Sequence, residues 1–192
     1  MFELSKRFFA EFCEIFGKES PRRKEAIEKY TNNSAFTTFV IDEINRIIAN
    51  MGYVPQNEYF RIDASGYELK HEIGKIKGFN LHCWNLKIAV EHENDPGDWL
   101  DEVIKIAHIC CSLRVVIGYI PMKSRGYLDM ERLKYSQKAL NELDCKNNLQ
   151  VGEFLVILGN SDTEENEDNY FNYKAYVFDP ETFCFGKLEE YN

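Results

Sequence analysis

The chain has 192 residues, of which 44% are hydrophobic and 29% are charged, and its formal net charge is −9. This size and apolar share fit one globular domain with a hydrophobic core, and an aromatic content of 14% excludes a mainly disordered chain. No apolar run approaches the roughly 20 residues of a membrane span, and charges interrupt the N-terminal apolar residues, unlike a signal peptide. We therefore expect a cytoplasmic protein without a membrane anchor, and the acidic charge argues against simple non-specific polyanion binding.

The first part of the chain is expected to be helical. Residues 2–16 have an amphipathic pattern, and residues 21–30 follow as a second short helix. A stronger helix is expected at 35–50, capped by Ser34. Its apolar side contains one charged residue, Glu43, which either reaches solvent from the rim of the helix or serves a function.

The middle of the chain changes from helical to extended patterns. Strands are expected at 59–69 and 85–93, with one more short strand near 79–84, because these segments are rich in β-branched and aromatic residues. A helix at 98–111 should follow, with Asp98 at its N-cap, and then a buried strand at 113–120. The remaining expected elements are a helix near 131–143, a strand at 153–158, an acidic loop at 161–170 and a strand at 170–178.

Several kinds of site can be set aside from the motifs. The chain has no phosphate-binding P-loop, no G-x-S-x-G and no G-x-G-x-x-G after a strand. Its six cysteines include no C-x-x-C pair, which favours reduced thiols. A zinc site built from His82, Cys83 and His108 has no support in their spacing. The candidate chemistry is therefore that of the acidic residues.

Three acidic residues lie in segments that are otherwise apolar or small. Glu91 and Glu93 alternate along a strand, so they should project from one face about 6.6 Å apart. Asp63 lies in a second expected strand, and the three carboxylates would meet if the two strands were neighbours. Such carboxylates repel one another unless a cation lies between them, and a hard divalent cation suits oxygen ligands. The alternatives are that Glu91 and Glu93 form the solvated face of an edge strand, and that Asp63 is a turn residue.

The order of these features resembles the PD-(D/E)xK superfamily of restriction-endonuclease-like nucleases. The resemblance runs from a helix with Glu43, through a strand with Asp63, to the segment Val90–Glu91–His92–Glu93, followed by a helix and an apolar strand. The third motif acid is followed by x-Glu instead of x-Lys, which is similar to the BamHI-like members. Ile62, and not proline, precedes the motif aspartate.

This resemblance implies a particular α/β fold. The expected core, αβββαβ with a mixed central sheet flanked by helices, spans about residues 35–125. Helices in residues 1–33 extend it at the N-terminus, and an αββ segment at 126–192 extends it at the C-terminus. The whole of 1–192 is then one domain.

The resemblance also implies a role for each acidic residue. Asp63 and Glu91 would bind Mg²⁺, with Mn²⁺ as a substitute, and the main-chain carbonyl of His92 would be a further ligand. Glu93 would take the place of the motif lysine and orient or deprotonate the attacking water, and Glu43 would assist a second metal ion. The implied activity is hydrolysis of DNA phosphodiester bonds, and a restriction role would fit a symmetric homodimer on a palindromic site.

Two other functions remain open from the sequence. The first is a non-cleaving nucleic-acid-binding or regulatory module of the same fold, because acidic residues in a fold do not prove turnover. The second is a carbohydrate-active enzyme that uses the Glu91–Glu93 pair. Its two carboxyl groups would normally come from separate elements on either side of the sugar, which makes this alternative weaker.

Overall fold

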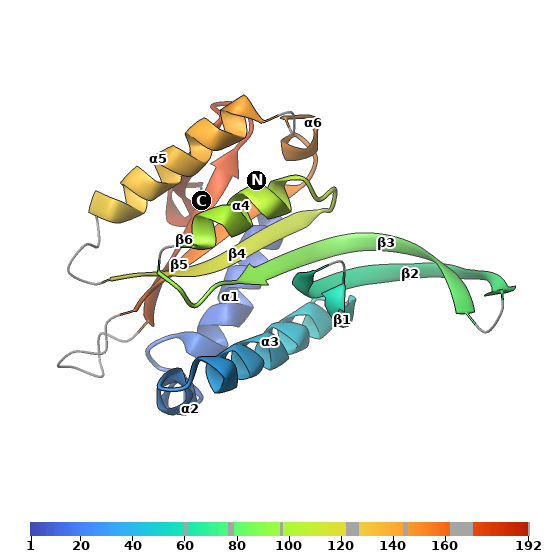
Figure 1. Cartoon of the computed structure of the whole chain (residues 1–192), viewed down its shortest axis with the longest axis horizontal. Coiled ribbons are helices and arrows are strands. Elements are labelled where there is room, and N and C mark those ends of the chain that lie inside the picture. Colours follow the sequence, from blue (N-terminus) through green and yellow to red (C-terminus); the bar gives the residue numbers. More distant parts are fainter. Residues whose placement is uncertain are drawn as a thin grey trace.

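The computed structural model describes residues 1–59, 61–76, 79–96, 98–121, 127–143, 146–161 and 171–191, without the side chains of 59, 69–76, 79–84, 127–128 and 146–147. Seven strands form one mixed sheet in which the spatial order follows the chain order (Figure 1). The pairs β1–β2, β2–β3, β5–β6 and β6–β7 are antiparallel, whereas β3–β4 and β4–β5 are parallel. The expected mixed α/β architecture is confirmed at this level. The elements are α1 (Glu3–Phe16), α2 (Arg23–Tyr30), α3 (Asn33–Asn50), β1 (Val54–Tyr59), β2 (Ile62–Ile76), β3 (Phe79–His92), α4 (Trp99–Ala107), β4 (Leu113–Ile120), α5 (Tyr127–Glu142), α6 (Lys146–Leu149), β5 (Glu153–Asn160), β6 (Phe171–Asp179), β7 (Cys184–Lys187) and the 3₁₀ helix η3 (Leu188–Tyr191).

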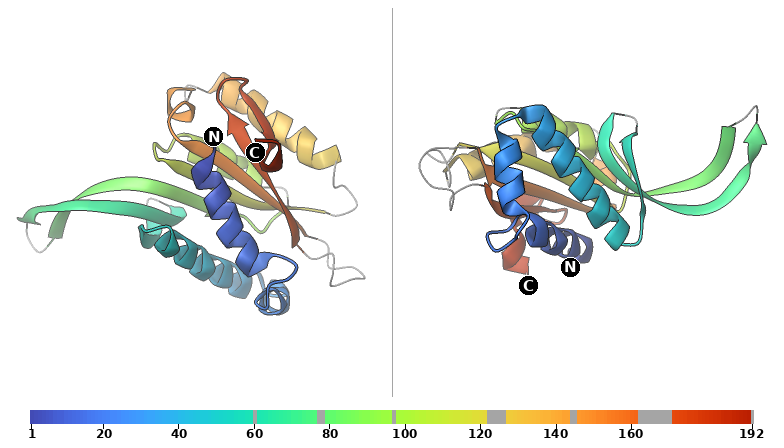
Figure 2. Two further views of the ribbon diagram at one scale, coloured as in Figure 1. Left: turned by 180° about the vertical axis from the view of Figure 1, so that it is seen from behind. Right: turned by 90° about the horizontal axis from the view of Figure 1, so that it is seen from below.

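Helices cover both faces of the sheet and create two apolar layers. On one face, side chains of α1 and α3 pack against alternate residues of the central strands, such as Val90 and Val115. On the other face, α4 and α5 pack against the intervening residues, such as Ala89 and Val116. Figure 2 shows the two groups of helices on opposite sides of the sheet. Since side chains alternate along a strand, this two-sided cover makes the central strands apolar throughout.

Strand β4 lies at the centre of the sheet and is buried along its whole length. Its one charged residue, Arg114, is fully buried and donates hydrogen bonds to the main-chain carbonyls of Ile109 (2.7 Å), Val151 (3.0 Å) and Asn148 (2.6 Å). These bonds join β4 to the connection that precedes it and to α6 and the turn before β5. The expectation of a buried strand is confirmed.

The helix ends differ from the sequence expectations in ways that the capping groups explain. Helix α3 begins at Asn33, and the side chain of Asn32 caps it by accepting a hydrogen bond from the Ala35 N–H at 3.1 Å, so the expected cap at Ser34 is wrong. Helix α4 does follow Asp98, although this residue makes no side-chain capping bond, and it ends at Ala107 instead of near residue 111. Helix α2 begins at Arg23, two residues later than expected.

The strands differ more from expectation than the helices do. The expected strands at 79–84 and 85–93 are one continuous strand, β3, which ends at His92. The sequence analysis did not predict β1, which carries Pro55 and pairs with the first part of β2 as an edge strand. It also missed the short elements α6, β7 and η3. The expected acidic loop lies outside the described residues, except for Ser161.

Strands β2 and β3 continue well past the other strands of the sheet. The last residue of β2 that pairs with β1 is Tyr67, and the first residue of β3 that pairs with β4 is Ile88. Beyond these points β2 and β3 pair only with each other, as far as Ile76 and Phe79. The result is a two-stranded arm, residues 68–76 and 79–85, that projects from the body in every view (Figures 1 and 2).

None of the helices in the described parts of the chain is long and apolar enough to pass through a membrane.

Candidate active site

Asp63 and Glu91 lie side by side on paired strands. Ala64 of β2 is opposite Val90 of β3 in the antiparallel register, which places the preceding residue, Asp63, beside Glu91. Asp63 is held there because its Oδ2 accepts a hydrogen bond from the main-chain N–H of His92 at 2.8 Å. The two strands are therefore neighbours, and they bring the carboxyl groups of Asp63 and Glu91 together.

The Glu91 carboxyl is buried, with an exposed fraction of 1%. Its Oε1 has no hydrogen-bond partner among the described residues. Burial raises the pKa of Glu91 from its ordinary value of 4.5 to about 8, and the charge of Asp63 adds to this rise, whereas Lys105 opposes it. Burial also raises the pKa of Asp63, against the opposing effects of its His92 hydrogen bond and Lys105. The pair therefore has too little nearby positive charge to stabilise both anions.

Lys105 of α4 supplies the positive charge that the pair does have. Its Nζ lies 2.9 Å from Oε2 of Glu91 and 2.5 Å from Oε2 of Glu102, and it donates to the main-chain carbonyl of Arg61 at 3.3 Å. The side chain is 40% exposed, so the ammonium group lies where the buried pair meets solvent. The result is a pair of carboxyl groups with a lysine beside them. We call Asp63, Glu91 and Lys105 the acid–lysine site.

No pattern in the sequence singled out Lys105, which lies close to the acidic residues Asp101 and Glu102 on the same helix. A usable signal was nevertheless present. A helix that connects two parallel strands packs back across them, so the helix after the Glu91 strand had to cross the carboxyl pair. The sequence could not show which of its residues would point there.

Glu93 does not join the acid–lysine site. Strand β3 ends at His92, and Oε1 of Glu93 instead accepts a hydrogen bond from the main-chain N–H of Asp95 at 2.7 Å, at the start of the following turn. Within the described part of the chain, no group of three or more His, Cys, Asp or Glu residues is arranged to hold a metal ion. The expected meeting of three carboxylates is therefore not formed, because the strand ends one residue too early.

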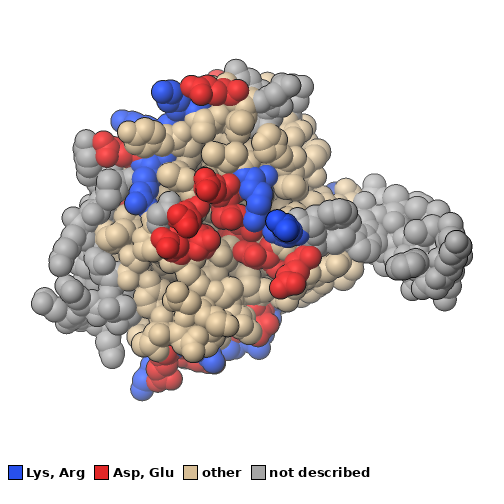
Figure 3. Space-filling view, in the orientation of Figure 1, with Lys and Arg blue, Asp and Glu red and all other residues tan. Residues whose placement is uncertain are grey.

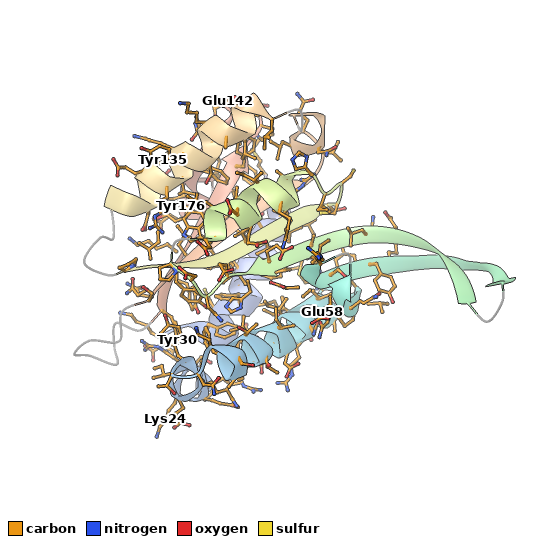
Figure 4. The ribbon with its side chains drawn as sticks, in the orientation of Figure 1. Lys24, Tyr30, Glu58, Tyr135, Glu142 and Tyr176 are labelled. Atoms are coloured by element: carbon orange, nitrogen blue, oxygen red, sulfur yellow. The ribbon has the colours of Figure 1, made fainter. Side chains whose placement is uncertain are left out.

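The side chain of His92 points away from the carboxyl pair, toward α3. Its Nε2 lies 3.0 Å from the Tyr119 hydroxyl, which is 3.2 Å from the Tyr173 hydroxyl. Its ring also contacts Phe36, at 5.7 Å between centroids, and Tyr30, labelled in Figure 4, packs against Phe36 at 4.9 Å. Burial lowers the pKa of His92 to about 3, so the ring is neutral and belongs to the packing of α3 on the sheet.

Glu43 is buried, but in a different place from the carboxyl pair. Its Oε1 lies 2.7 Å from Nη2 of Arg22 and 3.1 Å from Nη1 of Arg46, and its side chain is 2% exposed. It lines a polar pocket of about 580 Å³ formed by residues of α2, α3 and the segments that precede them. The structure does not bring Glu43 together with Asp63 and Glu91, and the two arginines account for its burial.

The donor set of the acid–lysine site fits a hard divalent cation in its chemistry. Asp63 and Glu91 offer carboxylate oxygens, one of which has no hydrogen-bond partner among the described residues. The raised pKa of both groups reflects a site that a cation would stabilise. Figure 3 shows acidic side chains gathered on the face that carries α4, with basic side chains beside them. The main-chain carbonyl of His92 stays an expected ligand.

Comparisons with family models, with curated proteins and with solved structures found no significant match to this chain.

Proposed function

We propose that the protein is a metal-dependent nuclease that hydrolyses DNA phosphodiester bonds. The observation that carries this proposal is the carboxyl pair of half-buried Asp63 and buried Glu91 on neighbouring strands, with Lys105 Nζ 2.9 Å from Glu91. The PD-(D/E)xK resemblance gave Glu93 in place of the motif lysine. Lys105, which comes from a helix and not from the strand, supplies a lysine beside the carboxylate pair.

The order of the elements supports the same proposal. From α3 to β4 the chain runs helix, three antiparallel strands, helix and a strand parallel to β3. These elements have the letter order αβββαβ of the resemblance, but the three strands are β1, β2 and β3, whereas the expected strands at 79–84 and 85–93 are both part of β3. The carboxyl pair lies where β3 ends and the chain leaves the sheet toward α4. In sheets with parallel strands, ligands commonly bind at the carboxyl ends of those strands.

Each residue of the acid–lysine site has a role in this proposal. Asp63 and Glu91 would hold the divalent ion, which when bound supplies positive charge to a phosphoryl group and its leaving oxygen. Lys105 is exposed enough to contact a phosphate oxygen, and its ammonium group would help to neutralise the approaching backbone. Glu93 lies next to the site in sequence, and it could orient water only after releasing the Asp95 N–H.

A nicking assay on supercoiled plasmid tests this function. Wild-type protein should cut in Mg²⁺ or Mn²⁺ and should not cut in chelator, whereas Asp63→Asn and Glu91→Gln should each lose at least a hundredfold in rate. Asp101→Asn removes an equivalent charge from an exposed position on α4 and should retain activity. Cleavage that survives chelator, or full activity in either site variant, would contradict the proposal.

A non-cleaving DNA-binding module of the same fold is the second candidate. It is favoured by the position of Glu93, which leaves two carboxylates and one lysine instead of the three carboxylates expected from the sequence. Fluorescence anisotropy with a labelled duplex separates the two functions. Binding in Ca²⁺ and Mg²⁺ without any product on a denaturing gel would favour the module over the nuclease.

A further inference from the structure

A pocket of about 430 Å³ lies between α1, β6 and η3, on the face of the sheet opposite α4 and the acid–lysine site. Figure 2 shows α1 and the C-terminal segment side by side on this face. The walls are largely apolar, because Phe9 and Ala10 come from α1, Ala175 from β6 and Leu188 from η3. Small-molecule sites typically have roughly 300–1,000 Å³, so this pocket is large enough for a small organic ligand.

The charged residues that line this pocket are mainly cationic. They are Lys6, Lys174 and Lys187 with one acidic residue, Glu189, in a chain whose net charge is −9. Glu189 Oε1 lies 3.7 Å from Lys187 Nζ and compensates part of that charge. The ammonium group of Lys6 has three donors, one of which binds the main-chain carbonyl of Tyr191 at 2.8 Å. Two donors of Lys6 therefore remain for an anion in the pocket.

The outer edge of β6 adds main-chain groups to the same pocket. Strand β7 pairs with β6 only over Tyr176–Asp179. Lys174 and Ala175, which line the pocket, pair with β5 on one side and with no described strand on the other. Main-chain groups alternate in direction along an antiparallel strand, so one of these two consecutive residues directs its N–H outward. An open strand edge of this kind can donate hydrogen bonds to a ligand.

We propose that this pocket binds a small organic carboxylate with an apolar body, such as a medium-chain fatty-acid anion. The apolar body packs against Phe9, Ala10 and Leu188. The carboxylate accepts hydrogen bonds from Lys6 and from the edge of β6, while Lys174 and Lys187 add positive charge. Because the pocket and the acid–lysine site lie on opposite faces of the sheet, this inference does not depend on the nuclease proposal.

The charges favour one carboxylate over other ligands of the same size. Glu189 would repel a ligand with several negative groups, such as a nucleotide, and the apolar walls offer such a ligand few hydrogen bonds. A neutral apolar ligand would gain nothing from the free donors of Lys6. The ligand class is therefore a monoanion whose remaining surface is apolar.

Equilibrium dialysis of the full chain against radiolabelled octanoate tests this proposal. Octanoate has an apolar tail and one carboxylate, and a ligand of its size can reach a dissociation constant below about 1 mM. Radiolabelled 1-octanol, which has the same tail and no charge, should bind at least tenfold more weakly. No binding at about 1 mM octanoate, or equal binding of octanoate and octanol, would overturn the proposal.

Two variants locate the binding to this pocket. Ala10→Trp fills the space beside α1 without changing any charge, and Lys6→Met removes the cation with free donors. Each should weaken octanoate binding at least tenfold. Ala49→Trp and Lys134→Met make the same changes at exposed positions on α3 and α5 and should bind octanoate like the wild type. Thermal melting identifies a variant that fails to fold, and unchanged octanoate binding by either folded pocket variant would overturn the proposal.

Discussion

Glu91 should make the stability of the metal-free protein fall as the pH rises. Its pKa in the folded protein is about 8, compared with an ordinary value of 4.5, because its carboxyl is buried beside Asp63. In this pH range the folded state therefore holds a proton that the unfolded state has lost, and the free energy of unfolding decreases as the pH increases from about 4.5 to about 8.

The size of the effect follows from the same shift. At about 1.4 kcal/mol per pKa unit, it corresponds to an upper limit of roughly 5 kcal/mol. Water entry and relaxation around the ionised carboxylate reduce such penalties, so we expect a measured loss of about 2 kcal/mol or more. Glu91→Gln cannot ionise and should not show this loss. At pH 9 it should therefore be more stable than the wild type by a similar amount.

Urea unfolding in chelator at pH 5.5 and pH 9 measures this difference. Glu142→Gln, at an exposed position on α5, is the matched control and should follow the wild type at both pH values. Saturating Mg²⁺ should restore part of the lost stability of the wild type at pH 9 and have no effect on Glu91→Gln. If the free energy of unfolding changes equally for the wild type and Glu91→Gln between the two pH values, the Glu91 carboxyl is not desolvated as described. The physical argument for a cation beside Glu91 then fails.

Three further changes test other parts of the structure. Lys105→Met should lower the rate of plasmid nicking at least tenfold, because it removes the cation beside Glu91. Circular dichroism should show that the variant is still folded, and a normal nicking rate would exclude Lys105 from the site. Glu43→Gln should leave the nicking rate unchanged and lower the free energy of unfolding by about 1–3 kcal/mol, because it weakens the contact with two arginines. A slower nicking rate with normal stability would mean that Glu43 acts in the site after all. Arg114→Met should lower the free energy of unfolding by about 3 kcal/mol, because three main-chain carbonyls lose their hydrogen-bond donor. Urea unfolding measures this loss, and an unchanged urea midpoint would mean that the three hydrogen bonds contribute nothing to stability.

DNA binding should also depend on divalent metal. Under the nuclease proposal a phosphodiester approaches the Asp63 carboxylate, and two like charges 4 Å apart repel by roughly 4 kcal/mol at an effective dielectric of 20. Asp63→Asn should therefore bind a labelled duplex more tightly than the wild type in chelator, and Ca²⁺ should promote binding by the wild type. Equal anisotropy-derived affinities in chelator, Ca²⁺ and Mg²⁺ would mean that the carboxyl pair does not face the phosphate.

Local patterns in the sequence determined much of the fold. The amphipathic spacing of the first helix and the apolar run of β4 follow from side-chain periodicity, which depends on residues close in sequence. The proximity of Asp63 to Glu91 also needs the pairing of β2 with β3. Trp99 is fully buried against β4, where a side chain at Gly118 would come within 2.6 Å of it.

Contacts between distant segments decided which side chains surround the carboxyl pair, because residue spacing along one strand or helix carries no information about such contacts. The end of β3 at His92 turned Glu93 away from the pair, and the crossing of α4 over the sheet brought Lys105 to Glu91. Arg22 and Arg46 account for the burial of Glu43, which helical periodicity alone had marked as a candidate for the site. The sequence therefore identified the two strand carboxylates, and only the tertiary structure decided which charges surround them, since a charge pair depends on distance in space and not on distance along the chain.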